Sequence, residues 1–178
     1  MTYLDIPGWF DFEDAYDLLY DQVSDGGVVV EIGTYLGKST AYLAMRIRDG
    51  RKVIHFFTVD HFQQGESSYP QTLANLAGAD VLSWVTVLQM ESAAAAALFK
   101  DSGVDAVWID GCHDYEAVKR DIELWLPKIS RLIGGHDYTD RWPGVKSAVD
   151  QIFPNARKGG ISWWLHDLNL KVCKGNTA

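Results

Sequence analysis

The sequence predicts an α/β fold in which helices cover both faces of a mainly parallel β-sheet. Two observations indicate this. Short apolar runs without polar alternation, such as residues 28–32 and 104–109, are typical of strands buried on both faces. These runs alternate along the chain with segments whose apolar residues have helical spacing. Strands that alternate with helices usually form a parallel sheet between two helical layers.

The expected strands are rich in Val, Ile, Phe and Trp, the residues that favour extended backbone. In chain order they span residues 28–32, 53–60, 85–90, 104–110, 131–135 and 161–167. The turn sequence SDGG directly precedes the first of them.

Six helices are expected between and before the strands. In chain order they span residues 12–23, 38–49, 71–77, 92–100, 114–127 and 144–153. The first has apolar residues at Phe12, Ala15 and Leu19, on one helical face. Consecutive alanines favour helix in the fourth. Pro127 ends the fifth, and Pro154 follows the sixth.

Length and charge limit the classes of function. With 178 residues, 47% of them hydrophobic, the chain is expected to form one domain over residues 1–178, with residues 1–25 as a helical extension. The formal net charge is −8 and the basic residues form no tract, which argues against nucleic-acid and membrane partners.

The ends of the chain and its cysteines indicate a cytoplasmic protein. The N-terminal sequence has no leader pattern, and no apolar run is long enough to span a membrane. Cys112 and Cys173 are too far apart for a metal knuckle and form no disulfide framework, which agrees with a reducing compartment.

Acidic residues or histidine stand at the end of five of the expected strands or directly after it. They are Glu31, Asp60, Glu91, Asp110, and the pair His136 and Asp137. Because the carboxyl ends of parallel strands meet at one edge of a sheet, and ligands of open α/β folds bind there, these side chains are expected to surround a binding site. Each alone would also fit a helix cap or a solvated turn.

The sequence of residues 33–37, Gly33-Thr34-Tyr35-Leu36-Gly37, restricts the class of ligand that the site can bind. It lacks the second glycine of a dinucleotide fingerprint and is one residue too short for a phosphate-binding P-loop. A ligand without phosphates, carrying a positive charge that Glu31 tolerates, fits better. Asp60 is placed to accept hydrogen bonds from ribose hydroxyls.

Over most of its length the chain resembles a known family. The segments VEIGTYLGKST, TVDHF, VDAVWIDGCHDYEAVKRDIELWLP, GGHDY and WPGVKSAVDQIF are similar to class I S-adenosylmethionine-dependent methyltransferases, in the small branch of macrocin-type and catechol-type O-methyltransferases. The resemblance implies a Rossmann-like three-layer α/β/α sandwich whose last strand is antiparallel. It also implies S-adenosylmethionine as cofactor.

A cofactor-binding set follows from the resemblance: Glu31, Gly33, Tyr35, Gly37, Ser39, Asp60, Met90, Glu91 and Ser92. The residues up to Ser39 would hold the methionyl portion and Asp60 the ribose. The last three would lie beside the adenine, where relatives often carry Gly-Asp-Ser. Met90 and Glu91 depart from that pattern.

The resemblance also implies a metal site for a divalent cation formed by Asp110, His136 and Asp137, with Asp110 also acting in catalysis. Relatives have an acid where this chain has His136, and imidazole extends the preference from Mg²⁺ toward Mn²⁺, Zn²⁺ or Fe²⁺, so Mg²⁺ or Mn²⁺ is expected. His113 stands where catechol-type enzymes carry a lysine base, and is the expected general base. The strand at 131–135 lacks the Pro-Gly-Gly turn that usually precedes it in relatives.

The expected function is metal-assisted methylation of a hydroxyl group on a small-molecule acceptor. Alternatives are a metal-independent methyltransferase with His113 as base, a hydroxylase-like relative, and a non-catalytic cofactor- or partner-binding module. Residues 61–71 are either a lid or a surface loop, and Arg141 and Trp142 are candidate acceptor contacts. Both a monomer and a homodimer are compatible with a domain of this size, and in a homodimer the N-terminal aromatic residues would pack against the second subunit.

Overall fold

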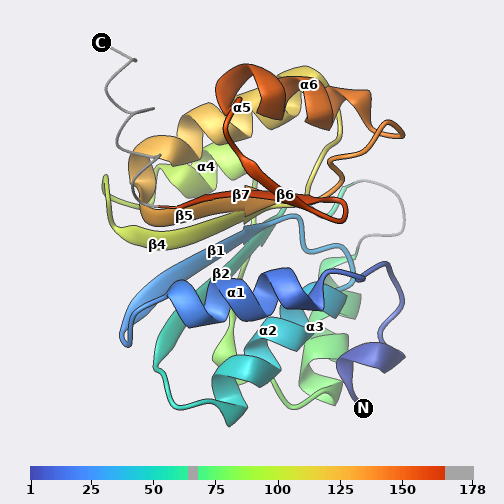
Figure 1. Cartoon of the computed structure of the whole chain (residues 1–178). Coiled ribbons are helices and arrows are strands. Elements are labelled where there is room, and N and C mark those ends of the chain that lie inside the picture. Colours follow the sequence, from blue (N-terminus) through green and yellow to red (C-terminus); the bar gives the residue numbers. More distant parts are fainter. Residues whose placement is uncertain (64–67, 167–178) are drawn as a thin grey trace.

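Seven strands form one sheet, with helices on both of its faces, in a computed structural model that describes residues 1–63 and 68–166 (Figure 1). The strands are β1 (Gly27–Ile32), β2 (Ile54–Asp60), β3 (Thr86–Gln89), β4 (Val104–Ile109), β5 (Ile129–Gly135), β6 (Arg157–Gly159) and β7 (Ser162–His166). The α-helices are α1 (Glu13–Gln22), α2 (Lys38–Asp49), α3 (Tyr69–Gly78), α4 (Ser92–Ala96), α5 (Tyr115–Trp125) and α6 (Pro143–Ile152). Short 3-10 helices are η1 (Tyr3–Asp5), η2 (Leu82–Trp84) and η3 (Leu126–Lys128).

The strand order is β3-β2-β1-β4-β5-β7-β6. Strands β1 to β5 pair in parallel, whereas β7 is antiparallel to both β5 and β6. The Rossmann-like three-layer sandwich and its antiparallel last strand are therefore confirmed. The chain moves outward from β1 to β3 and then returns to β4, so the strand order reverses between β1 and β4. A reversal of this kind opens a crevice at the carboxyl ends of the two strands.

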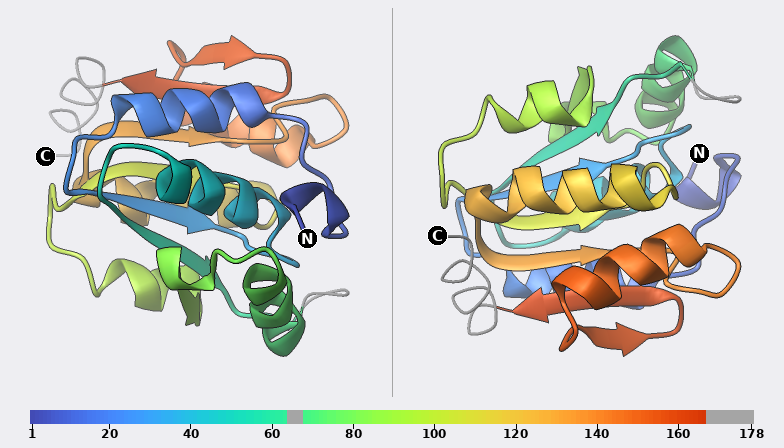
Figure 2. Two further views of the ribbon diagram at one scale, coloured as in Figure 1. Left: turned by 90° about the horizontal axis from the view of Figure 1, so that it is seen from below. Right: turned by 90° about the horizontal axis from the view of Figure 1, so that it is seen from above.

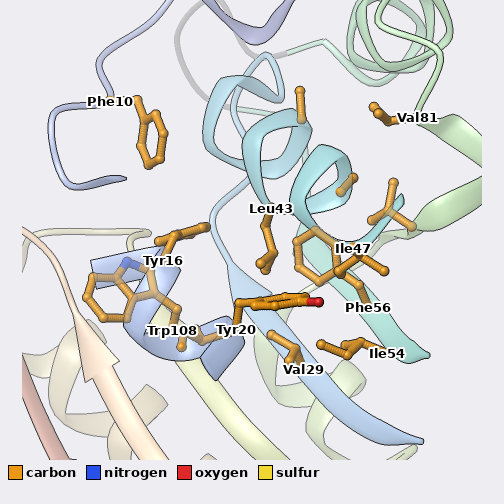
Figure 3. Close-up of a cluster of buried hydrophobic side chains, with 14 of the residues drawn as sticks. Phe10, Tyr16, Tyr20, Val29, Leu43, Ile47, Ile54, Phe56, Val81 and Trp108 are labelled. Carbon is orange, nitrogen blue, oxygen red and sulfur yellow. The ribbon is translucent and has the colours of Figure 1, made fainter. Parts of the chain in front are cut away.

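Two hydrophobic clusters hold the layers together. Helices α1, α2 and α3 cover one face of the sheet, and α4, α5 and α6 cover the other (Figure 2). On the first face Tyr16, Leu43 and Trp108 are buried between helices and strands (Figure 3). On the second, Trp125 and Trp163 are fully buried. Burial of such large side chains supplies most of the driving force for folding.

The N-terminal aromatic residues pack within the chain itself. Phe10, Phe12 and Tyr16 are all buried and contact one another edge-on. Phe12 also stacks on Trp108 of β4, with ring centroids 5.8 Å apart. These three side chains are therefore part of the first-face core, whereas Trp9 of the same segment is 85% exposed. A subunit interface that involves this segment stays a prediction.

Several elements differ from the sequence expectation, among them β6, β5 and α4. Strand β6 was not expected, because its three residues are exposed and carry no apolar pattern. Strand β5 begins at Ile129, before the expected residue 131, and its pairing with β4 is irregular between Val104 and Ala106. Helix α4 ends at Ala96, short of the expected residue 100. Among the residues that the structure describes, no helix is long and apolar enough to cross a membrane.

Candidate active site at the carboxyl edge of the sheet

A cleft of about 360 Å³ lies at the carboxyl ends of β1 to β4. Six of the residues expected to bind the cofactor line it: Gly33, Tyr35, Asp60, Met90, Glu91 and Ser92. Asp110, expected to act in catalysis, borders the same cleft. The strand-end residues thus meet around one concave surface, at the crevice where α/β folds bind ligands.

The backbone at Gly33 passes unusually close to the end of β4. Gly33 has a φ of +94°, and a Cβ atom there would lie 2.0 Å from the carbonyl oxygen of Asp110. The amide of Asp110 in turn donates to the carbonyl of Ile32. Glycine is required because any side chain would separate the loop after β1 from the end of β4.

Asp60 fixes the loop that follows β1. Its Oδ2 accepts hydrogen bonds from the amides of Thr34 and Tyr35, at 3.0 and 2.9 Å, and its Oδ1 accepts one from the amide of Phe62 at 2.7 Å. Tyr35 has a φ of +52°, a conformation that these bonds help to hold. Asp60 therefore shapes the cleft as well as lining it.

Glu31 is buried behind the cleft and does not line it. Its carboxylate is only 1% exposed and accepts hydrogen bonds from four hydroxyl groups. The donors, at 2.5 to 2.7 Å, are Tyr16, Ser39, Thr40 and Thr58. Burial raises the pKa of Glu31, although these four bonds oppose the shift. The carboxylate joins α1, α2 and β2 to β1.

Ser39 and Gly37 also lie outside the residues that line the cleft. The Ser39 hydroxyl donates to Glu31 Oε1 at 2.7 Å. A Cβ atom at Gly37 would lie 3.3 Å from Thr72 of α3, so this glycine allows α3 to pack closely. Each of the three residues Glu31, Gly37 and Ser39 has a structural role in the fold. Their contact with the cofactor stays a prediction.

Beside the cleft, Asp110, His113 and Asp137 form a cluster. One ligand atom from each lies within 4.8 Å of the others. Asp110 follows β4, His113 lies in the loop before α5, and Asp137 follows β5. The Nε2 atom of His113 is 2.7 Å from Asp137 Oδ2, and the His113 ring stacks on Trp142 with centroids 4.0 Å apart. Two carboxylates and one imidazole at this separation suit a divalent cation.

His136, the residue expected as the third ligand, lies behind this cluster. It is 7% exposed, and its Nδ1 lies 3.6 Å from Asp110 and 3.4 Å from Asp137. Its other nitrogen is 3.3 Å from Asp11. Burial alone would lower the pKa of His136, but the two carboxylates near Nδ1 outweigh it and raise the pKa to about 10.

The same neighbours act on Asp137. Burial favours its neutral form, but hydrogen bonds with His113 and His136 outweigh burial and lower the pKa of Asp137. Asp137 is thus ionised at neutral pH. Ligation by His136 stays a prediction, and the structure adds His113 to the candidate ligands.

Sequence reasoning missed several residues of the site. Beyond the expected set, the side of the cleft nearest α5 is lined by Gly111, Cys112, Ala117, Arg120 and Asp121. A signal for Asp121 exists in the sequence, since its spacing from Val118 and Trp125 puts it on the inner face of the expected helix. Asp11 had no such signal, because its contact with His136 depends on how the N-terminal segment folds back.

A family model described as methyltransferase domain matches residues 30–138, more than half of the chain. The chain therefore belongs to the methyltransferase-domain family, and its fold is that of the class I S-adenosylmethionine-dependent enzymes. Among curated proteins, the uncharacterized protein y4gI of Sinorhizobium fredii is 30% identical over 109 residues. That match covers 57% of this chain but 12% of y4gI, so the chain spans a small part of this relative.

Solved structures share the fold at low sequence identity. An O-methyltransferase from Bacillus cereus, in complex with S-adenosylhomocysteine, is 18% identical with a TM-score of 0.62, covering 92% of this chain and 84% of that chain. A Staphylococcus aureus protein assigned as a caffeoyl-CoA O-methyltransferase is 17% identical with a TM-score of 0.65, covering 92% and 86%. A Streptococcus mutans protein assigned as a methyltransferase, also with S-adenosylhomocysteine, is 10% identical with a TM-score of 0.67, covering 90% and 99%.

Proposed function

We propose that this chain transfers the methyl group of S-adenosylmethionine to a hydroxyl oxygen of a small molecule, assisted by a divalent cation at Asp110, His113 and Asp137. The observation that carries the proposal is the position of Asp110, which borders the cofactor cleft and also belongs to the metal-ligating cluster. The two reactants would thus meet at one residue. Family membership and the O-methyltransferases of the same fold support this reading.

The reaction is a displacement in line with the breaking bond. The acceptor oxygen loses its proton and bonds to the methyl carbon, while the carbon–sulfur bond breaks and leaves S-adenosylhomocysteine. Bound at the cluster, the cation would lower the pKa of the acceptor hydroxyl and orient it. Asp110 and Asp137 supply negative charge for that cation, and Gly33 and Tyr35 shape the adjoining cofactor cleft. Placement of the acceptor beside the methyl group contributes to the rate as well.

A second candidate is metal-independent transfer with His113 as general base. The contact of 2.7 Å between His113 Nε2 and Asp137 Oδ2 favours it, because a carboxylate so placed holds an imidazole in one orientation. In this candidate Nε2 donates to Asp137, so Nδ1 is the nitrogen that accepts the proton. A cation bound at Nε2 would replace the hydrogen bond to Asp137, so the two candidates differ in what Nε2 binds.

Calorimetric titration with S-adenosylmethionine, before and after chelation, tests the cofactor first. Binding in both conditions supports the proposed cleft, and binding in neither would overturn the function. Methyl transfer to a panel of catechols and sugars, with Mn²⁺ or Mg²⁺ and then with chelator, separates the candidates. Loss on chelation and recovery with metal support metal assistance, whereas a rate that survives chelation supports His113 as base.

A further inference from the structure

Helix α5 carries a carboxylate on its buried face. Its buried residues are Val118, Asp121, Ile122 and Trp125, at the spacing of one helical stripe. Asp121 is 8% exposed, although packing alone would favour an apolar side chain there. A buried carboxylate is costly unless polar groups surround it, so its surroundings indicate what it can bind.

A hydrogen bond orients the hydroxyl group next to Asp121. The indole Nε1 of Trp125 donates to Ser92 Oγ at 2.9 Å. Because the indole can only donate, Ser92 accepts this bond and its own proton stays available to the Asp121 carboxylate. Burial raises the pKa of Asp121, and the Ser92 hydroxyl opposes that shift. A carboxylate offers about four acceptor positions, so Ser92 leaves most of them open to a ligand.

Asp121 lines the cofactor cleft on the side formed by the segment after β3. The cleft is bounded there by Met90, Glu91 and Ser92 and, from α5, by Arg120 and Asp121. The first three are the residues expected beside the adenine base. Adenine carries an exocyclic amine that donates hydrogen bonds, and a carboxylate is the natural acceptor for an amine on a base edge.

We propose that Asp121 accepts a hydrogen bond from the exocyclic amine of the cofactor's adenine and so sets the base specificity of the cleft. This inference rests on the proposed function, because it requires S-adenosylmethionine in this cleft. A base with a carbonyl oxygen at the same position places an acceptor against an acceptor and binds less well. Asp121 is a specificity determinant and takes no part in methyl transfer.

Calorimetry with two product analogues tests the inference without any turnover. S-adenosylhomocysteine carries the amine, and S-inosylhomocysteine carries a carbonyl in its place. The wild type is expected to prefer the adenine compound by about tenfold or more, as for a hydrogen bond to a charged group. In Asp121→Asn, whose amide both donates and accepts, the two compounds should bind with similar affinity.

A matched control lies on the same helix. Glu123→Gln removes the same charge from an exposed residue that borders a neighbouring surface groove and not the cofactor cleft. This variant should keep the wild-type preference. If Asp121→Asn does not fold, the wild type alone still gives an answer: an S-adenosylhomocysteine dimethylated on the exocyclic nitrogen lacks both donors and should bind at least about tenfold more weakly.

The outcomes separate this inference from the proposed function. Equal binding of both compounds by the wild type, or an unchanged preference in Asp121→Asn, overturns the role of Asp121 and leaves the cofactor assignment intact. Binding of neither compound by the wild type overturns the cofactor assignment and the inference together.

Discussion

The imidazole of His113 and the carboxylate of Asp137 lie 2.7 Å apart, after two neighbouring strands and outside the cleft at the ends of β1 to β4. This pair joins the loop after β4 to the loop after β5. Trp142 stacks on the imidazole and limits the orientations that it can adopt. The contact serves either candidate mechanism, because Asp137 is a potential metal ligand in one and the orienting group of the base in the other.

Replacing Asp137 should separate catalysis from cofactor binding. Asp137→Asn removes the charge but suits the local backbone, whose φ of +60° asparagine tolerates. We expect turnover to fall by about 10²-fold or more and the affinity for S-adenosylmethionine to stay unchanged. Asp140→Asn, at an exposed residue paired with Lys146, is the control and should keep its activity. Equal losses of affinity and turnover in Asp137→Asn would contradict the assigned role.

Two glycines with similar backbone conformations allow a test of the close contact between the loop after β1 and the end of β4. Gly33→Ala places a methyl group against the Asp110 carbonyl, whereas Gly26→Ala, at a φ of +77°, meets nothing within 4 Å. Both substitutions carry backbone strain, of about 1–2 kcal/mol. Gly33→Ala should lower the free energy of unfolding, measured with urea, by at least about 2 kcal/mol more than Gly26→Ala does. Only Gly33→Ala should also weaken cofactor binding, measured by calorimetry. A similar loss of unfolding free energy in both variants would show that the contact between Gly33 and the Asp110 carbonyl has no effect on stability.

The hydrogen bond from Tyr16 to Glu31 should contribute measurably to stability. Tyr16→Phe keeps the ring that packs against Phe12 and Trp108 but removes one of four donors to a buried carboxylate. We expect the free energy of unfolding to fall by about 1.5–3 kcal/mol, as for a bond to a charged group. Tyr42→Phe, which removes a less buried bond to Asp17, should cost less. An equal loss of unfolding free energy in both variants would mean that the burial of Glu31 does not strengthen its hydrogen bond with Tyr16.

The raised pKa of Glu31 predicts a pH-dependent difference in stability. A carboxyl group whose pKa is higher in the folded state contributes stability below its unfolded value, near 4.5, and loses that contribution as the pH rises through the folded pKa. The free energy of unfolding of the wild type minus that of Glu31→Gln should therefore decrease from pH 4.5 upward and then level off. Urea titrations of both proteins over this range provide the measurement. A difference that increases with pH would mean that the four donors lower the pKa instead.

The sequence predicted the centre of the parallel sheet well, because β1 and β4 are almost entirely buried and carry an apolar run. Helix α2 was predicted over its observed bounds, since Gly37 and Gly50 flank it. Strand β6 escaped prediction because pairing with β7, not hydrophobic pattern, makes it a strand. Strand pairing depends on residues distant in the sequence, which local propensity does not include.

The candidate site was predictable where it depends on the ends of strands. Asp60, Asp110 and Asp137 follow strands whose positions the apolar runs define, so their convergence followed from parallel topology alone. The place of His113 beside Asp110 and Asp137 was not predictable as part of a candidate metal site, because it depends on the path of the loop between β4 and α5. Ligation by His136 stays a prediction. The part of the lid expectation that concerns residues 64–67 lies outside the described residues, as does Cys173.

The carboxylate of Glu31 in β1 accepts hydrogen bonds from residues of three other elements, α1, α2 and β2. A substitution at Tyr16, Thr40 or Thr58 changes the environment in which the other donors act, so the effects of these substitutions should not add. In a library of random variants selected for folding, these positions should covary as a group. The exposed residues of β6 should instead vary independently of one another among the selected variants.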